Sequence, residues 1–467
     1  MKLGRTRHVH FVGVGGIGMS GIAELLANLG YAVSGSDAKR SSITDRLASL
    51  GVRIATGHDR ANVGEADVVV VSSAIRADNA EVVEARARHL PVIPRAEMLA
   101  ELMRLKFGIA IAGAHGKTTT TSMVALMLER AGLDPTAVIG GRLSAFGSNA
   151  RLGRGEVMVA EADESDRSFL KLSPAIAVIT NIDREHMEAY GTFDALVDAF
   201  AAFADRVPFY GVVVACADDA PVATMLPRLT RRTITYGFGA GADVRGEAPT
   251  TDGKSGTCDV VYQVRGLPGG SGRGTIAIAV PGRHNLLNAL AAVAVGLELG
   301  VPFDRIRAAL AEFKGAERRY QRVGEASGVT IVDDYGHHPT EIAAVLQAAA
   351  AGRPSRIVAV FQPHRYSRTR DLLDEFGPAL SAADVVVLTD IYAAGESPIP
   401  GVTVESLADA MRPSVRDLRV VPALDEVPEA VGALVEPGDL VITLGAGSIA
   451  SVGEKVLSAI AAREAHA

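Results

Sequence analysis

The stretch that decides how this chain is interpreted is Phe107-Gly-Ile-Ala-Ile-Ala-Gly-Ala-His-Gly-Lys-Thr-Thr-Thr-Thr-Ser122. The small and apolar residues from Ile109 to Gly113 predict a buried strand, and the apolar pattern after the loop predicts a helix that runs to Gly132. A strand, a glycine-framed turn, a Lys-Thr pair and a helix together have the layout of a phosphate-binding loop.

In such a loop, backbone N–H groups and the helix N-terminus face an anion, Lys117 supplies a positive charge, and Thr118 can ligate Mg²⁺. The spacing Gly113-x-x-Gly116-Lys117 is two residues shorter than G-x-x-x-x-G-K, and an ordinary turn with a solvated lysine is the alternative interpretation. The strand-to-helix context favours a nucleotide-phosphate site, and we predict an enzyme that uses ATP.

Length and composition predict an α/β protein of several domains. The chain has 467 residues, 48% of them hydrophobic, which is too long for one core and predicts two to four domains. Val/Ile runs between helical patterns predict layers built on parallel sheets. The net charge of −7 gives little support to binding of nucleic acid, and no run of about 18 apolar residues predicts a membrane span. Two cysteines and the absence of a signal-peptide pattern favour a soluble, cytoplasmic protein.

The N-terminal region carries a second nucleotide signature. A predicted strand from His8 to Val14 is followed by Gly13-Val-Gly15-Gly-Ile-Gly18, a helix, a second strand and an acidic residue, Asp37. This βαβ context matches the dinucleotide fingerprint, in which a pyrophosphate lies across a helix N-terminus. An NAD(P) site and a nucleotide-sugar site both fit. Ser72 and Ser73 follow the next predicted strand, where they either contact the same ligand or form a polar turn.

Polar residues follow two further strands of the central region. Glu161-Ala-Asp163-Glu164-Ser-Asp166 comes after a predicted strand, and carboxylates at this place are natural Mg²⁺ partners, although an acidic surface loop is the alternative. His186 follows the next strand and is a candidate second contact for a cation or a phosphate.

Farther along the chain, three more groups of polar residues are candidates for a site. His284, Asn285 and Asn288 open a long Ala-rich helix, and Arg318 and Arg319 suit a phosphoryl group under transfer. A third doubly wound unit then begins, with Tyr335, His337, Arg365 and Arg368 after its strands.

Taken together, these residues make the chain resemble the Mur ligases of bacterial cell-wall synthesis along its whole length. The motifs that carry the resemblance are GVGGIGMSG, AGAHGKTTTTS, EADESD, TNIDREHM, GRHNLLNA, RRYQ, DDYGHHPTEI, FQPHRYSRT and GAGSI. The resemblance implies three domains: a Rossmann-like UDP-sugar domain at 1–105, a central P-loop ATPase domain with a mainly parallel sheet at 106–320, and a Rossmann-like amino-acid domain at 321–467. The third domain would close over the second through a hinge near Arg319 to Arg322.

The resemblance is greatest to the alanine-adding branch of the family, and it implies an ATP-dependent ligase. ATP would phosphorylate the carboxylate of UDP-N-acetylmuramate, and L-alanine would attack the acyl phosphate. This implication decides the first-domain alternatives against NAD. It also makes ATP and Mg²⁺ the expected cofactors and a monomer or weak homodimer the expected state, with no nucleic acid or membrane partner.

The family roles map onto this chain as follows. Implied catalytic residues are Lys117, His186, Arg318, Arg319 and His337, and implied Mg²⁺ ligands are Thr118, Glu161 and His186. Implied ATP contacts are Gly113, Ala114, His115, Gly116, Lys117, Thr118, Thr119, His284, Asn285 and Asn288. Implied contacts of the UDP-sugar and the amino acid are Gly15, Gly16, Ile17, Gly18, Met19, Asp37, His58, Ser72, Ser73, Tyr335, His337, Arg365 and Arg368.

Two departures from the family pattern bear on the assignment. Ala114 stands where the family usually has threonine, which removes one hydroxyl contact. No lysine lies between Lys171 and Lys254, whereas later ligases of the pathway carbamylate a lysine in that region. The alanine-adding branch lacks that lysine, so its absence agrees with this branch.

Three other functions compete with this interpretation. A ligase that attaches a murein tripeptide in cell-wall recycling shares the chemistry, but the Tyr-Gly-His-His sequence after Asp-Asp favours the alanine branch. An NAD-linked oxidoreductase leaves the Lys117 loop, Glu161 and His186 unexplained. A non-catalytic binding protein with degenerate sites is disfavoured by the intact Lys117, Thr118 and Glu161.

Overall fold

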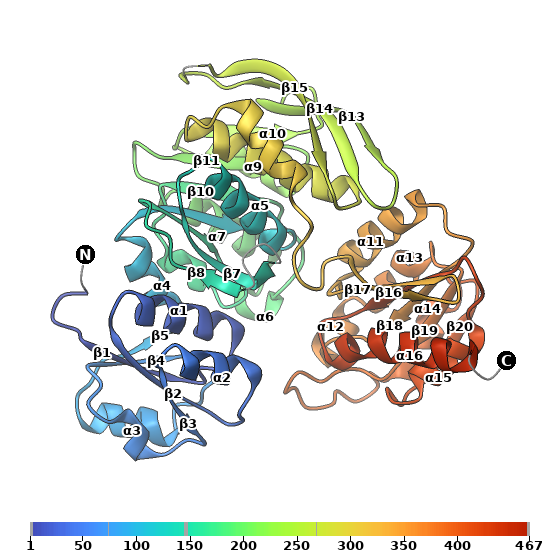
Figure 1. Ribbon diagram of the computed structural model, residues 1–467, viewed down its shortest axis with the longest axis horizontal. Coiled ribbons are helices and arrows are strands. Elements are labelled where there is room, and N and C mark those ends of the chain that lie inside the picture. The colour runs from blue at the N-terminus through green and yellow to red at the C-terminus, as the bar shows by residue number, and fades with distance from the viewer. Residues whose placement is uncertain (1–2, 73, 144–147, 268, 465–467) are drawn as a thin grey trace. The chain divides into compact units, whose positions relative to one another are not determined.

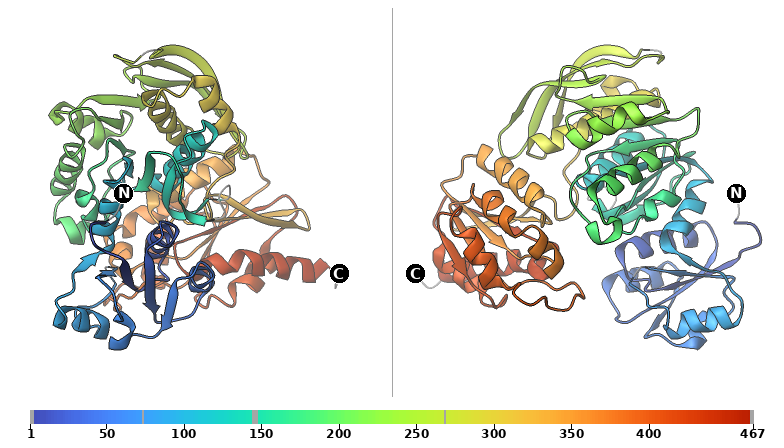
Figure 2. Two further views of the ribbon diagram at one scale, coloured as in Figure 1. Left: turned by 60° about the vertical axis from the view of Figure 1, so that its left-hand side comes forward. Right: turned by 180° about the vertical axis from the view of Figure 1, so that it is seen from behind.

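The computed structural model covers all 467 residues and is described here for residues 3–72, 74–143, 148–267 and 269–464. The chain divides into two compact units. The first comprises the chain up to Glu247 together with Asp259–Ile276 and Leu287–Phe313, and the second comprises Ala248–Cys258, Ala277–Leu286 and the chain from Lys314 onward. The predicted domain limits at 105/106 and 320/321 stay predictions. Three sheets, coloured from blue to red along the chain, organise these units (Figures 1 and 2).

The first sheet is a five-stranded parallel sheet in the order β3-β2-β1-β4-β5. Its strands are β1 (His8–Val12), β2 (Ala32–Asp37), β3 (Arg53–Thr56), β4 (Val68–Val71) and β5 (Val92–Pro94). Its helices are α1 (Ile17–Asn28), α2 (Ser42–Ser49), α3 (Ala80–Ala87) and α4 (Arg95–Met103), with the short 3₁₀ helix η1 (Arg60–Val63). Apolar side chains on both faces of the sheet are buried, as a parallel sheet between two helical layers requires.

The central sheet has ten strands in the order β15-β14-β13-β12-β11-β10-β6-β9-β7-β8. The strands are β6 (Phe107–Ala112), β7 (Thr136–Leu143), β8 (Ser148–Arg151), β9 (Val157–Glu161), β10 (Ile176–Ile179), β11 (Val212–Cys216), β12 (Thr233–Gly237), β13 (Val244–Thr251), β14 (Gly256–Gln263) and β15 (Ser271–Ile278). Pairing is parallel from β13 to β7, and β8 adds an antiparallel edge. The prediction of a mainly parallel central sheet is therefore confirmed.

The helices of the central region include one that is buried almost all round. Ten residues of α5 (Lys117–Arg130) are buried, which is typical of a helix enclosed in a core. The others are α6 (Met187–Tyr190), α7 (Phe193–Ala204), α8 (Ala220–Met225), α9 (Arg283–Glu298) and α10 (Phe303–Ala311), with the 3₁₀ helices η2 (Ser168–Lys171) and η3 (Leu226–Arg228). Phe169 of η2 stacks on Phe203 of α7 with ring centroids 5.1 Å apart, in the same core cluster as Phe11 and Leu26 of the first sheet region.

The third sheet has six strands in the order β16-β17-β21-β18-β19-β20. The strands are β16 (Gln321–Ala326), β17 (Val329–Asp334), β18 (Ile357–Phe361), β19 (Val385–Leu388), β20 (Leu418–Val420) and β21 (Leu440–Leu444). Among the strands of this sheet that the structure describes, β16 pairs antiparallel with β17 and the other pairs are parallel. The helices are α11 (Pro339–Ala351), α12 (Tyr366–Asp371), α13 (Phe376–Leu380), α14 (Val404–Met411), α15 (Val427–Leu434) and α16 (Val452–Glu464), with η4 (Leu373–Glu375) and η5 (Ser448–Ser451). Two core clusters fill its faces, as expected for a doubly wound unit.

Candidate active site

Three loops meet at one edge of the central sheet. Strand β6 lies between β9 and β10, with Ile111 opposite Glu161 and Ala112 opposite Ile179. The loop after β6, the acidic segment after β9 and the segment after β10 therefore leave the sheet side by side. This arrangement brings together the segments that contain Lys117, Glu161 and His186, as the sequence predicted.

Two glycines of the loop after β6 occupy places where a side chain does not fit. Gly113 has a φ of 138° and Gly116 a φ of 81°, in the region that L-residues rarely adopt. A Cβ atom on Gly113 would clash with Thr180 Oγ1, and one on Gly116 would lie 2.6 Å from Asn288 Oδ1. The glycines thus allow the loop to approach β10 and α9 closely.

The segment after β10 locks the loop in place. His115 N donates to Asn181 Oδ1 at 2.8 Å, Asn181 Nδ2 donates to His115 O at 3.0 Å, and Thr180 Oγ1 donates to the same carbonyl at 2.6 Å. The N–H of Ala114 donates to Asn181 O at 3.1 Å. Thr180 and Asn181 were not predicted to act on the loop, because their hydrogen bonds depend on strand register that the sequence does not show.

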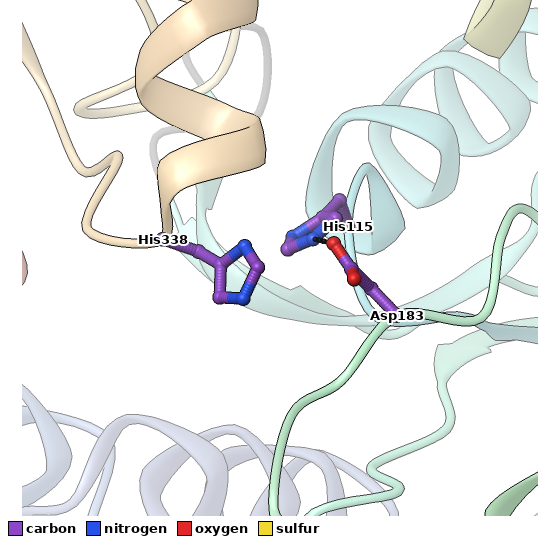
Figure 3. Close-up of side chains that lie close together, drawn as sticks. All are labelled: His115, Asp183 and His338. Atoms are coloured by element: carbon purple, nitrogen blue, oxygen red, sulfur yellow. Dashed lines mark hydrogen bonds and ion pairs between the residues drawn. The ribbon is translucent and has the colours of Figure 1, made fainter. Parts of the chain in front are cut away.

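The side chain of His115 is paired with an acid. Its Nε2 lies 2.8 Å from Asp183 Oδ2, and Figure 3 shows the two side chains side by side. The pair fixes the direction of the imidazole at the mouth of the loop. Asp183 lies in the TNIDREHM motif, but its partner was not predicted.

Lys117 is held inside the loop by three acceptors. Its Nζ donates to Glu164 Oε1 at 2.8 Å, to Gly113 O at 2.6 Å and to Ala114 O at 3.0 Å. Burial alone would lower the pKa of Lys117, but the carboxylates of Glu164, Glu185 and Asp163 together outweigh this effect and raise it, so the amine stays charged. Burial raises the pKa of Glu164 to about 7, against the opposing influence of Lys117.

The predicted Mg²⁺ ligands lie on all three segments. Thr118 is in the first turn of α5, and Glu161 ends β9, where its Oε1 accepts a hydrogen bond from Gly140 N at 2.6 Å. Around His186, ligand atoms of Glu164, Glu185 and His186 all lie within 4.8 Å of one another. Two carboxylates and an imidazole are suitable donors for a divalent cation. Glu164 and Glu185 were not among the predicted ligands.

The residues predicted to contact ATP from the Ala-rich helix have different surroundings. Asn288 faces Gly116, whereas Asn285 Nδ2 donates to Pro281 O at 2.6 Å as a local cap. His284 belongs to the second unit. Burial, together with the charge of Arg319, lowers the pKa of His284 to about 4, and the ring is therefore neutral at pH 7.

The glycine-rich loop after β1 lies at the carboxyl edge of the first sheet, as predicted. Asp37 accepts a hydrogen bond from Gly15 N at 2.8 Å, so it acts on the loop itself. A Cβ on Gly18 would lie 2.6 Å from Arg95 Nη1. The side chain of Met19 is 2% exposed and belongs to the core, which leaves its backbone as the part that can face a ligand. 

Gly16, Ser72 and Ser73 are three further residues that were predicted to contact a ligand at this edge. Gly16 is exposed and precedes α1, which begins at Ile17. The Oγ of Ser72 would lie 3.6 Å from a Cβ on Gly13, which places Ser72 beside the loop. Ser73 lies outside the described residues.

His58 rests on a buried network that the sequence did not reveal. Its Nδ1 lies 3.1 Å from Ser36 Oγ, and Ser36 donates to Glu81 Oε2 at 2.6 Å. Glu81 is fully buried and also meets His10 Nε2 at 3.1 Å and Asn62 Nδ2 at 2.7 Å. Because α3 also contains Glu84 and Arg86, the sequence does not indicate which of its charged residues points into the protein.

In the second unit, the paired arginines surround Tyr335. The guanidinium carbons of Arg318 and Arg319 lie 5.1 and 5.2 Å from the centroid of the Tyr335 ring. Arg318 Nε donates to Asp333 Oδ2 at 2.8 Å, and Arg319 Nη1 donates to Glu341 Oε1 at 3.2 Å. Both arginines therefore contact residues at the carboxyl end of β17.

The other predicted residues of the third sheet lie at the same edge. His337 and His364 have ring centroids 5.4 Å apart, and Arg368 Nη1 lies 3.1 Å from His364 Nδ1. Arg365 has a φ of 71°, and its Nη1 lies 3.9 Å from Glu396 Oε1. His364 and Glu396 were not predicted as site residues, although His364 lies within the FQPHRYSRT motif.

Comparison with known proteins shows the family. Three family models match successive parts of the chain: "Mur ligase family, catalytic domain" at residues 8–107, "Mur ligase middle domain" at 111–296, and "Mur ligase, glutamate ligase domain" at 318–447. The chain belongs to the Mur ligase family, which confirms the resemblance and the expected α/β fold built on three sheets.

Individual relatives match the chain over nearly its full length. A UDP-N-acetylmuramate–L-alanine ligase of Anaeromyxobacter dehalogenans is 56% identical and covers 98% of this chain and 99% of its own length. The protein of the same name from Geobacter sulfurreducens is 55% identical, with 97% and 98% covered. The crystal structure of UDP-N-acetylmuramate-alanine ligase MurC from Thermotoga maritima superimposes with a TM-score of 0.81 at 29% identity, covering 98% of this chain and all of that one.

Within the described residues, no helix combines the length and the apolar character that are needed to cross a membrane.

Proposed function

We propose that this chain is an ATP-dependent ligase that joins L-alanine to the carboxylate of UDP-N-acetylmuramate. The observation that carries the proposal is the 55–56% identity, over 97–98% of the chain, to relatives named for this reaction. The geometry of the loop around Lys117 supports it, because this loop presents a charged amine and a helix N-terminus at the edge where the three segments meet.

In the first step, a carboxylate oxygen of the UDP-sugar attacks the γ-phosphorus of ATP. An O–P bond forms, the P–O bond to ADP breaks, and an acyl phosphate results. Lys117 is proposed to bind the β- and γ-phosphates, and Asn288 faces the same loop across Gly116. Arg318 and Arg319 are proposed to stabilise the charge on the transferring phosphoryl group. 

In the second step, the amine of L-alanine attacks the acyl carbon. A C–N bond forms, phosphate leaves, and the amine gives up a proton. Tyr335, His337, Arg365 and Arg368 are proposed to hold the amino acid and the acyl group, since all follow strands of the third sheet. The neutral ring of His284 is suited to hydrogen bonding rather than to charge pairing at pH 7.

The donors at the carboxyl edge of the central sheet fit Mg²⁺. Thr118, Glu161 and His186 are proposed as ligands, and the buried Oε2 of Glu164, which has no hydrogen-bond partner within the described residues, shows that an unused oxygen donor lies nearby. When bound, Mg²⁺ would supply positive charge to the phosphate oxygens. 

The UDP-sugar is proposed to bind at the edge of the first sheet, on the loop that includes Gly15 and Gly18, beside Asp37, His58 and Ser72. Because ATP and a UDP-sugar are the substrates, we place the reaction in the cytoplasm. A monomer or weak homodimer stays our expectation, and the molar mass of the full chain by light scattering would test it.

The test is phosphate release by the purified full chain with ATP, Mg²⁺ and UDP-N-acetylmuramate, supplied with each amino acid in turn. We expect one phosphate per L-alanine joined, with the product identified by mass spectrometry. Turnover with a murein tripeptide but not with L-alanine would overturn the proposal in favour of a recycling ligase. Reduction of NAD by the protein would overturn the ligase class itself.

A further inference from the structure

Lys117 cannot reach a phosphate without changing partners. The three protons of its ammonium are taken up by Glu164, Gly113 and Ala114. The two carbonyls belong to the loop itself, whose shape Asn181 fixes. Glu164 is the charged member of the three, and a phosphate with its own negative charge competes with it directly.

Breaking the ion pair with Lys117 leaves the Glu164 carboxylate buried without a cation, which is unfavourable. Its side chain is 3% exposed, and its Oε2 has no hydrogen-bond partner within the part of the chain that is described. Its backbone carbonyl accepts a hydrogen bond from Tyr190 Oη at 2.5 Å, which holds the residue in position. A buried carboxylate that loses its cation needs another positive charge or a proton, since burial penalises the unpaired charge.

A second cation partner can be accommodated beside Glu164. Ligand atoms of Glu164, Glu185 and His186 lie within 4.8 Å of one another, and Glu185 is also buried. The turn that holds His186 has a φ of 57° at this residue, which directs the chain into α6. Oxygen donors with one imidazole suit Mg²⁺ or Mn²⁺.

We propose that Glu164 is an exchangeable counterion, which pairs with Lys117 until a nucleotide phosphate takes the lysine and then binds a divalent cation together with Glu185 and His186. The inference rests on the proposed use of ATP and adds two ligands to the predicted set. The nucleotide and the cation then bind cooperatively. The phosphate takes Lys117 and leaves Glu164 unpaired, and the cation neutralises Glu164.

The test measures the Kd of ADP for the full chain by calorimetry, once with EDTA and once with Mg²⁺. For the wild type we expect Mg²⁺ to tighten ADP binding. In Glu164→Gln, ADP should bind several-fold more tightly in EDTA, since the competing charge is gone. The gain from Mg²⁺ should fall by about tenfold, the size of a typical coupling between two sites. These opposite shifts are the signature of a counterion that is exchanged.

Asp166→Asn is the matched control. Asp166 is exposed on the same segment, and its hydrogen bond from Ser168 N at 2.9 Å can be kept by the asparagine oxygen. It should leave both Kd values within about twofold, which separates the Glu164 effect from a general loss of negative charge. 

Glu185→Gln is the second variant, and it keeps the test decisive if Glu164→Gln does not fold. It should reduce the gain from Mg²⁺ while leaving the Kd of ADP in EDTA nearly unchanged. With ADP present, Mn²⁺ followed by paramagnetic resonance should bind this variant more weakly than it binds the wild type. 

Two results would overturn the inference. If Mg²⁺ tightens ADP binding equally in the wild type and in both glutamate variants, the role of Glu164 is refuted. The proposed use of ATP is not affected by that result, because the wild type still binds ADP. Failure of the wild type to bind ADP under either condition would refute the proposed use of ATP and this inference with it.

Discussion

Replacing Glu81 by glutamine tests whether a buried negative charge stabilises the first sheet. Glu81 lies on α3 and is fully buried. Its Oε2 meets Ser36 Oγ at 2.6 Å and His10 Nε2 at 3.1 Å, and its Oε1 accepts from Asn62 Nδ2 at 2.7 Å and from Asp59 N at 3.2 Å. One carboxylate thus ties β1, β2 and η1 to α3.

The size of the effect follows from the pKa of this carboxyl group. Burial opposes its charge, but the hydrogen bonds from His10, Ser36 and Asn62 outweigh burial and lower the pKa of Glu81 to about 2. This is roughly two units below the ordinary value for glutamate, and each unit is worth about 1.4 kcal/mol, so the charged form contributes ~3 kcal/mol to folding.

The two sides of the carboxylate respond differently to Glu81→Gln. The hydroxyl of Ser36 and the ring of His10 can each become an acceptor and meet the new amide group, whereas Asn62 Nδ2 and Asp59 N can only donate. If the amide oxygen faces those two donors, the network survives without its charge, at a cost of about 1–3 kcal/mol. Glu81→Ala leaves every donor without an acceptor and should cost about 3–5 kcal/mol.

The measurement is hydrogen exchange of the full chain followed by mass spectrometry, read on the amides of β1 and β2. The matched control is Glu84→Gln, which removes the same charge from the same helix at a half-buried position. Because the folded pKa of Glu81 is depressed, its contribution is present above the unfolded pKa and is lost as pH falls toward about 2. The difference in melting temperature between wild type and Glu81→Gln should therefore shrink between about pH 4.5 and pH 2.

Equal protection in the wild type, Glu81→Gln and Glu84→Gln would refute the reasoning, since it would show that the buried charge does not stabilise the sheet. A difference between wild type and Glu81→Gln that persists unchanged to pH 2 would show that the pKa of Glu81 is not lowered.

Three other substitutions test the candidate site. Lys117→Ala should lower turnover by on the order of 10²-fold or more, because the proposed role of the lysine is to stabilise the phosphates of ATP. Binding of the UDP-sugar by calorimetry should be unchanged, and near-normal turnover would contradict the loop assignment. Gly113→Ala should abolish ATP binding, since the added Cβ would clash with Thr180 and a φ of 138° is strained for alanine. Normal binding would show that the loop is free to shift. Arg365→Ala should raise the phosphate released per peptide bond above one, as the acyl phosphate is lost to water; a ratio of one with an unchanged KM for L-alanine would place Arg365 outside the site.

Several strands that are buried on both faces were predicted with the correct bounds, whereas the edge strand β16 was missed, for a physical reason. Inner parallel strands are buried on both faces and appear as apolar runs in the sequence. Such runs predict strands at Val68–Val71, Ile357–Phe361 and Leu440–Leu444, which are the bounds of β4, β18 and β21. The edge strand β16 reads QRVGEA and is interrupted by a shift in register after Arg322, so no apolar run or alternation identifies it. It also begins where the sequence predicted a hinge.

For the candidate site, the sequence predicted where the residues lie but not which side chains they contact. A motif located Lys117 and the three strand ends, because an open α/β sheet gathers its functional loops at the carboxyl edge. Neither Glu164 nor Asn181 was assigned a partner, since a side-chain contact depends on register between strands far apart in the sequence. Glu81 gave no signal at all: its helix is weakly amphipathic, and only the packed structure shows which face is buried.

Each of the three sheets uses a carboxylate to hold a donor that the sequence assigned to a substrate. Asp37 accepts from Gly15 N, Glu164 from Lys117 Nζ and Asp333 from Arg318 Nε, each at 2.8 Å. Such a donor is already oriented, so a substrate anion gains little free energy by ordering it. The anion must instead replace the carboxylate as the acceptor of that hydrogen bond. The free energy of binding is then the difference between two charge-assisted hydrogen bonds plus the cost of the released carboxylate. A ligand that brings its own cation meets that cost, and one that brings only negative charge does not. We therefore expect the loop around Lys117 to favour a metal-bound nucleotide over a bare anion, because Glu164 is left unpaired when the lysine changes its partner.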